Sequence, residues 1–191
     1  MNYIELNNQV IIRDENGKYQ LNKDKEALKS YLEDYIEPKM KKFDNLNDRL
    51  NYLVENDYYS KEILDLYDQY VIDVIYDFIR AKNFKFQSYM SASKFYQNYA
   101  LKSNDGEEIL ENYEDKVLIV ALTLGNGEPK LAKDIAEKLI NQEFQPATPT
   151  FLNAGRARGG KMVSCFLVNV EDSCEGISYA VSSANHLSKI G

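Results

Sequence analysis

FQPATPTFLNAGRARGGKMVSCFLVNVED, residues 144–172, is the stretch around which the chain is organised. Its first part, residues 144–160, has no regular hydrophobic period and contains two Pro, three Gly and two Arg, which predicts an irregular loop. Residues 162–170 are nearly continuously apolar, which is typical of a strand covered on both faces. A donor-rich loop that leads into a buried strand bearing Ser164 and Cys165 indicates a functional site.

Most of the chain before this stretch predicts amphipathic helices that pack into a bundle. A short alternating piece, Tyr3 to Ile12, and a turn at residues 14–17 come first. Apolar residues then recur at helical spacing. The predicted helices run from an N-cap at Asp24 to Pro38, from Leu46 to Val54, from Ser60 to Ile79, from Ser91 or Ser93 to Tyr99, from Ile109 to Leu124 and, after a break at residues 125–127, from Pro129 to Ile140.

A last helix is predicted after the strand, with Ser173 as its N-cap and an apolar stripe from Ile177 to Leu187. A strand followed by a helix is half of a βαβ unit, whose partner strands are not found in this sequence. We therefore expect the fold to be mainly α, with an incomplete α/β part at its end. The expected division is 1–83, 84–160 and 161–191.

Composition excludes several classes of protein. The 191 residues are 44% hydrophobic and carry a net charge of −7, which argues for a globular chain and against general binding of nucleic acid or membrane surfaces. Two cysteines, no secretory signal and no apolar run of membrane-spanning length indicate a reducing, cytoplasmic compartment. One His and two Cys nine residues apart do not fit a zinc site, so no metal is expected.

Several motifs resemble the signatures of one enzyme family. Residues 144–155 read FQPATPTFLNAG, residues 163–167 read VSCFL and residues 187–191 read LSKIG. Further matches upstream are NLNDRLNYLVENDYYSKEILDLY (45–67), FKF (84–86) and YEDKV (113–117). Over essentially its whole length, the chain resembles the large, catalytic alpha subunit of class Ib ribonucleotide reductase.

The resemblance implies a fold in which a helical N-terminal region precedes a ten-stranded α/β barrel. This chain would supply the helical region and the first strand and helix of the barrel, with no room upstream for a complete ATP-cone. Members of the family are several times longer. The cysteine that carries the thiyl radical, the partner of Cys165 and the C-terminal shuttle cysteines would all lie beyond Gly191, so we expect the chain alone to be inactive.

The resemblance also assigns site residues. Cys165 is similar to the first member of the redox dithiol; without the motif, a small buried hydrophobe is the commoner fate of a lone Cys. Thr148 and Ser164 correspond to substrate contacts, although a loop residue before Pro149 and an ordinary strand residue are the plain alternatives. Asp172 corresponds to a contact of the allosteric deoxynucleotide effector; a helix N-cap or first-turn charge is its alternative.

The other candidate residues receive plainer interpretations. Arg156 and Arg158 are expected on a solvated loop, although they offer charges that suit phosphates. Cys174 is interpreted as structural and His186 as an ordinary helix residue. The tyrosine-rich stripes are expected in the core, and none is assigned to radical transfer.

The resemblance implies an oxidoreductase that reduces ribonucleoside diphosphates for DNA synthesis. This chain would bind no cofactor itself; a small subunit with a dimetal-tyrosyl radical would supply the radical, and a deoxynucleotide or ATP would act as effector. The expected partners are the remaining C-terminal part of the subunit, that small subunit, a glutaredoxin-like or thioredoxin reductant, and a second copy of the complete subunit.

Alternatives remain open at this point. A non-catalytic helical interaction module would use residues 24–140 and retain the strand as a relic. A stand-alone thiol oxidoreductase is disfavoured because no Cys-x-x-Cys motif is present. An engineered piece, a truncated gene and a natural half that assembles with a second polypeptide are equally compatible with the sequence. In isolation, we expect residues 162–170 to expose apolar side chains and to associate or be disordered.

Overall fold

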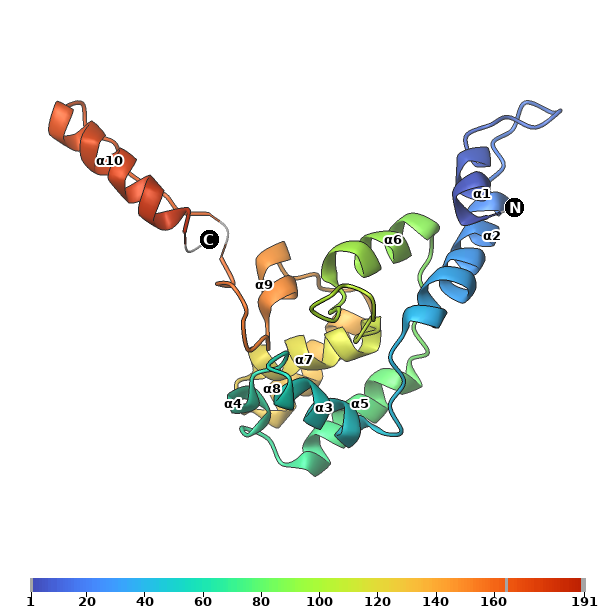
Figure 1. The fold of residues 1–191 in the computed structure, drawn as a ribbon, viewed down its shortest axis with the longest axis horizontal. Coiled ribbons are helices and arrows are strands. Elements are labelled where there is room, and N and C mark those ends of the chain that lie inside the picture. Colours follow the sequence, from blue (N-terminus) through green and yellow to red (C-terminus); the bar gives the residue numbers. More distant parts are fainter. Residues whose placement is uncertain (1, 164, 190–191) are drawn as a thin grey trace.

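The computed structural model describes residues 2–163 and 165–189, and it is built almost entirely from helices (Figure 1). The helices are α1 (Tyr3–Gln9), α2 (Asn22–Ser30), η1 (Tyr31–Ile36), η2 (Glu37–Lys39), α3 (Leu46–Glu55), α4 (Lys61–Leu64), α5 (Gln69–Ala81), α6 (Tyr89–Lys94), η3 (Phe95–Tyr99), α7 (Tyr113–Gly125), α8 (Pro129–Ile140), α9 (Thr148–Asn153) and α10 (Cys174–Leu187). The predicted fold class, mainly α, is confirmed. Within the described residues, no helix has both the length and the apolarity needed to cross a membrane.

Helix α7 is the centre of the helical body. Its side chains from Val117 to Leu122 are each at most 2% exposed, and α4, α5 and α8 pack around it. Asn112 begins the helix in a capping box with Asp115. Asn126, with a φ of 43°, ends it in the left-handed conformation. The sequence signals for this stop and for Pro129 in the first turn of α8 are therefore confirmed.

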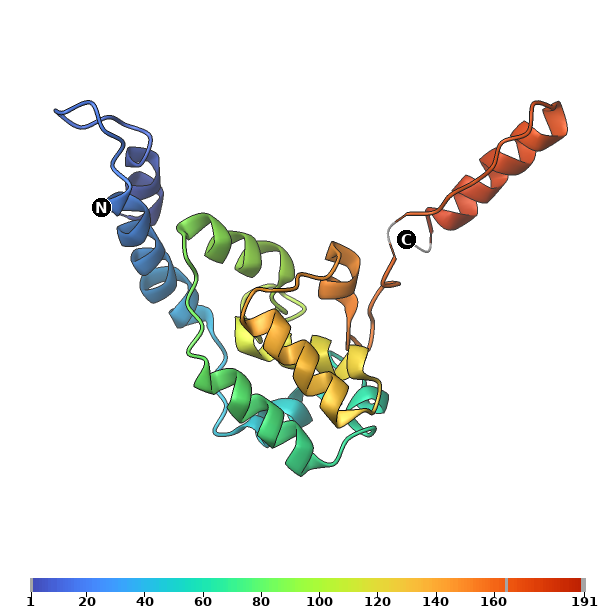
Figure 2. The same cartoon turned by 180° about the vertical axis from the view of Figure 1, so that it is seen from behind.

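The first helices form an arm on the side of the body opposite α10 (Figures 1 and 2). Helix α1 packs on α2, and α2 packs on α6. Four tyrosine rings join α1, η1 and α6, because Tyr3 lies 5.0 Å from Tyr31, 5.5 Å from Tyr35 and 5.7 Å from Tyr89, measured between ring centroids. Aromatic packing at these distances stabilises the junction. The prediction that the tyrosine stripes are core holds for Tyr31, which is 1% exposed, but not for Tyr35, which is 40% exposed.

Two predictions about the first 40 residues are wrong. Residues 3–9 form a helix rather than an alternating piece, because Asn2 and Glu5 make a capping box whose effect outweighs the pattern. Asp24 is not an N-cap but lies inside α2, which begins at Asn22. Its carboxylate instead accepts a hydrogen bond from the backbone N–H of Tyr89, at 3.3 Å and 3.4 Å from its two oxygens.

The long helix predicted from Ser60 to Ile79 is divided into α4 and α5. The break includes Tyr67, whose side chain packs at the junction of α7 and α8. Its hydroxyl donates a hydrogen bond to the Leu122 carbonyl at 2.8 Å and accepts one from the Gly127 N–H at 2.8 Å. Two predicted helix starts also differ. Helix α6 is capped by Ser88 rather than by Ser91 or Ser93, and Ile109 lies ahead of α7.

The strand predicted over residues 162–170 is not formed in its described part, residues 162–163 and 165–170. A strand forms only through backbone pairing with a neighbouring strand, and no such pairing involves these described residues. Helix α10 follows as predicted, with the side chain of Ser173 accepting a hydrogen bond from the Gly176 N–H. Residues 165–189, which we call the C-terminal segment, stand away from the helical body (Figures 1 and 2).

Candidate functional site

The predicted irregular loop contains a short helix. Thr148 to Asn153 form α9, which Pro149 favours as a first-turn residue. Thr148 is therefore helical rather than an extended residue before proline, which corrects that interpretation. Its side chain is exposed, and its Oγ1 lies 3.3 Å from the hydroxyl of Tyr99.

Close packing fixes the end of α9 against α7. Phe151 is 2% exposed, and its ring lies 5.4 Å from that of Tyr99. Gly155 has a φ of 71°, and a Cβ added there would come within 2.1 Å of Cγ1 of Ile119. Only glycine combines that backbone conformation with so close an approach. The close contact between Gly155 and Ile119 therefore fixes the position of the loop on α7.

The two loop arginines lie in different environments. Arg158 is 72% exposed and pairs with Asp57 at 2.8 Å, as the solvated-loop interpretation predicts. Arg156 is only 11% exposed in its side chain and pairs with Glu111 at 2.9 Å, so that interpretation is wrong for it. Arg156 also donates to the carbonyls of Leu152 and Tyr99, each at 3.4 Å.

Glu111 and Lys116 are both fully buried beneath α9. Glu111 accepts hydrogen bonds from the Tyr59 hydroxyl at 2.6 Å, the Leu101 N–H at 2.8 Å and Arg156. Lys116 donates to the Leu152 carbonyl at 3.2 Å. Neither residue is predicted as functional from the sequence. Their only signal was position: Glu111 directly follows the apolar pair 109–110, and Lys116 directly precedes the apolar run 117–122 of α7.

Burial and charge shift the pKa values of this cluster. Burial alone would raise the pKa of the Glu111 carboxyl, but the charges of Lys116 and Arg156 and the accepted hydrogen bonds outweigh it and hold that pKa below its usual value. Burial lowers the pKa of the Lys116 ammonium to about 8; Glu111 opposes this shift and Arg156 adds to it. Both groups are charged at neutral pH, so the cluster carries one negative and two positive charges.

Two side chains of α9 connect it to the segment that follows. Thr150 Oγ1 donates to the Met162 carbonyl at 3.3 Å, and Asn153 Nδ2 donates to the Lys161 carbonyl at 3.0 Å. Cys165 comes three residues later and is exposed, which corrects the prediction that it is buried in a strand. The predicted substrate residue Ser164 lies outside the described residues. The structure thus connects the element that bears Thr148 to the start of the segment that bears Cys165.

The predicted effector residue, Asp172, is exposed and precedes the N-cap Ser173, so it is not itself the cap. It lies between the extended segment and α10, far along the chain from α9, and α10 stands apart from α9 in both views (Figures 1 and 2). Cys174, the first residue of α10, is exposed, which leaves it no structural role in the core.

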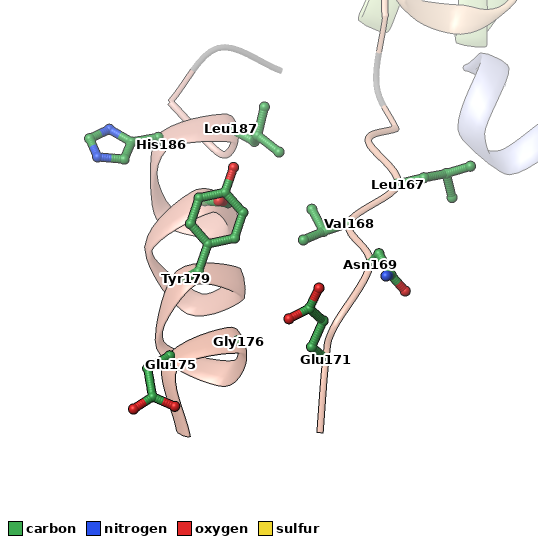
Figure 3. A pocket seen from close by; sticks show the side chains of 10 residues that line it. Leu167, Val168, Asn169, Glu171, Glu175, Gly176, Tyr179, His186 and Leu187 are labelled. Carbon is green, nitrogen blue, oxygen red and sulfur yellow. The ribbon is translucent and has the colours of Figure 1, made fainter. Parts of the chain in front are cut away.

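An open groove lies between α10 and residues 167–171, with a volume of about 750 Å³. Figure 3 shows Val168 and the Tyr179 ring on its inner side, whereas Leu167 and His186 point away. Leu167 is fully exposed, and Tyr179 is 72% exposed. The groove is lined by apolar side chains together with the carboxylates of Glu171 and Glu175. Among the described residues, no three His, Cys, Asp or Glu side chains come together as a metal site would require.

Comparison with known proteins gives one consistent result. The family model described as "Ribonucleotide reductase N-terminal" matches residues 3–84, and the model described as "Ribonucleotide reductase, all-alpha domain" matches residues 85–159. The ribonucleoside-diphosphate reductase subunit alpha of Bacillus subtilis is 51% identical over 189 residues, which are 99% of this chain and 27% of that protein. The NrdEB subunit alpha of Bacillus phage SPbeta is 50% identical over 190 residues, or 100% of this chain and 17% of that protein.

A more distant relative agrees with these matches. The subunit alpha of Mycoplasma genitalium is 40% identical over 187 residues, covering 98% of this chain and 25% of that protein. The chain thus spans about a quarter or less of the length of these curated relatives. The two family models together cover nearly all of the chain up to residue 159. The chain therefore belongs to the ribonucleotide reductase family and corresponds to the N-terminal portion of its large, alpha subunit.

Proposed function

We propose that this chain is the N-terminal part of a class Ib ribonucleotide reductase catalytic subunit, and that with the rest of the subunit it reduces ribonucleoside diphosphates to deoxyribonucleoside diphosphates. The observation that carries the proposal is its similarity, over nearly every residue, to proteins named as ribonucleoside-diphosphate reductase subunit alpha. The chain's own contribution is to hold the loop and the cysteine segment beside the substrate.

Cys165 is the proposed first member of the redox dithiol. In the reaction, a thiyl radical on another part of the subunit removes the 3′ hydrogen of the ribose, and the 2′ hydroxyl leaves as water. Two cysteine thiols supply the two electrons and become a disulfide. The exposure of Cys165 supports this role because its thiol is accessible to a ribose and to a second cysteine. The remaining part of the subunit would enclose it and exclude water.

Thr148 and Ser164 are the proposed substrate contacts. The Thr148 hydroxyl is exposed at the first turn of α9, where it can donate to or accept from a ribose hydroxyl or a phosphate oxygen. Thr148 would act from a seated helix rather than from a mobile loop. Ser164 immediately precedes Cys165 in the sequence, so a contact there would place the substrate next to the thiol.

Asp172 is the proposed contact for the allosteric effector, a deoxynucleotide or ATP. Its exposed carboxylate stands beside the start of α10 and is free of any capping role. A carboxylate in this position suits the hydroxyl groups of a sugar better than phosphate, because it would repel the phosphate charge.

The proposed partners are the remaining C-terminal part of the catalytic subunit, a small subunit with a dimetal-tyrosyl radical, a glutaredoxin-like or thioredoxin reductant, and a second copy of the complete subunit. We further propose a cytoplasmic location, because exposed thiols such as Cys165 and Cys174 suit a reducing compartment. The division at residues 83–84 and 160–161 is supported by the ranges 3–84 and 85–159 of the two family matches.

A non-catalytic helical module is the second candidate. The buried hydrophobic core cluster runs from Tyr31 to Ala154, so the helical body has a core that does not depend on the cysteine segment. Such a body would serve as an interaction module even if Cys165 did no chemistry.

Turnover distinguishes the two functions. The chain is mixed with the remaining C-terminal portion of the subunit, the radical subunit and a reductant, and reduction of CDP is measured. Cys165→Ser is run beside the wild type, with Cys174→Ser as the matched control. We expect turnover that requires both portions, is lost in Cys165→Ser and persists in Cys174→Ser. A folded complex without turnover would favour the non-catalytic module.

A further inference from the structure

We propose that Glu111, Arg156 and Lys116 form a buried positioning device that fixes α9, and with it Thr148, against α7. None of the three residues has a role assigned from the sequence motifs, and Glu111 and Lys116 are buried beneath the loop that bears Arg156. The inference rests on the proposed function only in identifying α9 as an element of the substrate site.

Helix α9 needs support from residues outside itself. It has six residues, and a helix that short is not stable by itself in water. Its C-terminal end receives two cationic donors at one carbonyl: Leu152 O accepts from Lys116 Nζ at 3.2 Å and from Arg156 Nε at 3.4 Å. Positive groups at this end also complement the helix dipole.

The three buried charges compensate one another only in part. Two cations under a short helix would repel each other, and Glu111 lies with them as the compensating anion, with Arg156 at 2.9 Å. Burying three charges costs desolvation energy that apolar side chains of similar volume would avoid. A network that only stabilised the fold would be better made of hydrocarbon. What this network adds is directional geometry, since Lys116 and Arg156 donate hydrogen bonds to carbonyl and carboxylate oxygens at fixed positions.

Further backbone hydrogen bonds fix the loop that follows α9. The Gly155 carbonyl accepts from the Ser60 N–H at 2.9 Å, and the Ala157 N–H donates to the Tyr58 carbonyl at 3.1 Å. Together with Arg156, these bonds hold the chain on both sides of the arginine. The orientation of α9 is then passed on through Thr150 and Asn153 to the residues that lead to Cys165.

Arg158 provides the matched control. It lies two residues from Arg156 on the same loop and also makes an arginine–carboxylate pair at 2.8 Å, but both partners are more than 60% exposed. Exposed pairs of this kind contribute little to stability. Arg156→Met and Arg158→Met therefore remove the same charge from the same loop and differ only in what the charge holds.

The first test is amide hydrogen exchange on this chain. In Arg156→Met we expect the Phe151, Ala154 and Ala157 amides to exchange about tenfold faster or more, while the amides of α7 stay within about twofold. In Arg158→Met all of these should stay within about twofold, and Arg156→Lys should recover part of the protection. Unchanged α9 exchange in Arg156→Met would overturn the proposal. An equal acceleration in α7 would also overturn it, because the network would then serve general stability only.

The second test is kinetic and uses the complemented enzyme. A positioning role predicts that Arg156→Met raises KM for CDP by about fivefold or more while kcat falls less, and that Arg156→Lys restores KM. Arg158→Met should leave both unchanged. A parallel loss of active enzyme with unchanged KM would contradict positioning. If the wild type shows no turnover at all, the proposed function fails, whereas the exchange result still decides the role of the network.

Discussion

Helices α7 and α10 differ by one residue in length, at 13 and 14 residues, yet their surroundings are opposite. Ten residues of α7 are buried, whereas Ala180 is the one buried residue in α10. Both sequences offer apolar residues to a core. The difference shows that burial depends on which partners the chain supplies: α7 is enclosed by α4, α5 and α8, but the apolar face of α10 meets little more than residues 167–171.

A matched pair of isoleucines gives the largest expected contrast. Ile119 on α7 is 1% exposed and Ile177 on α10 is 49% exposed. We expect Ile119→Ala to lower the free energy of unfolding by about 3–4 kcal/mol, because it leaves a cavity in a closed core. Ile177→Ala should change it by less than about 0.5 kcal/mol. Urea denaturation of both variants is the measurement, and equal effects would break the comparison.

The seat of α9 can be tested at Gly155. Gly155→Ala should cost about 3 kcal/mol, because it adds a steric clash with Ile119 to the strain of a positive φ. Gly106→Ala is the control: its φ is +78°, but no atom lies within 4 Å of the added Cβ, so about 1 kcal/mol is expected. If urea denaturation gave the same loss of unfolding free energy for Gly155→Ala and Gly106→Ala, the loop would be able to move away from α7 at no cost in free energy.

The buried ammonium predicts a pH dependence. The pKa of Lys116 is about 8 in the folded chain and about 10.5 when unfolded, so between these values the unfolded state binds more protons and stability rises with pH. Relative to Lys116→Met, the wild type should gain about 2 kcal/mol between pH 7 and pH 10. The charged groups that act on the Lys116 ammonium are Glu111 and Arg156, and the Tyr59 hydroxyl donates a hydrogen bond to Glu111. All three residues are present in the wild type and in Lys116→Met.

Parallel denaturation curves at several pH values measure this difference. A difference that stays constant from pH 7 to pH 10 would show that the folded chain does not depress the pKa of Lys116. Lys29→Met, at a lysine whose side chain is 73% exposed, serves as the control.

The smallest expected contrast is between helix caps. Asn112→Ala should lower the free energy of global unfolding by about 1 kcal/mol, because it uncaps the central helix. Ser173→Ala removes the equivalent cap from α10 and should lower helical content by circular dichroism with little effect on global unfolding. If Ser173→Ala destabilised the whole chain equally, α10 would have to be coupled to the body.

The sequence predicted the elements that carry their own local signals. Helix α3, the stop at residues 125–127, Pro129 in α8 and the Ser173 cap are all where the pattern placed them. The prediction failed where residues distant in the sequence determine the local structure. The break before α5 depends on a hydrogen bond from Tyr67 to α7, and the strand predicted over residues 162–170 needs a neighbouring strand. Arg156 looked like a loop residue because the carboxylate that holds it is 45 residues away.

The same limit applies to the candidate site. The motifs identified Thr148 and Cys165, and the structure shows α9 seated on the body and the cysteine on an open segment. No local pattern shows that Glu111 and Lys116 lie under that helix, because their relation to Leu152 exists only in three dimensions. Sequence motifs therefore identify candidate site residues more readily than the buried residues that position them.

Hydrogen exchange of the C-terminal segment, with and without the remaining portion of the subunit, tests the central comparison most directly. In the isolated chain, α7 amides should exchange only through global unfolding, and residues 165–189 should exchange readily in a monomer or associate through their exposed apolar groups. Adding the remaining portion should protect residues 165–189 and leave α7 unchanged. A monodisperse chain in which residues 165–189 are already protected would contradict the account.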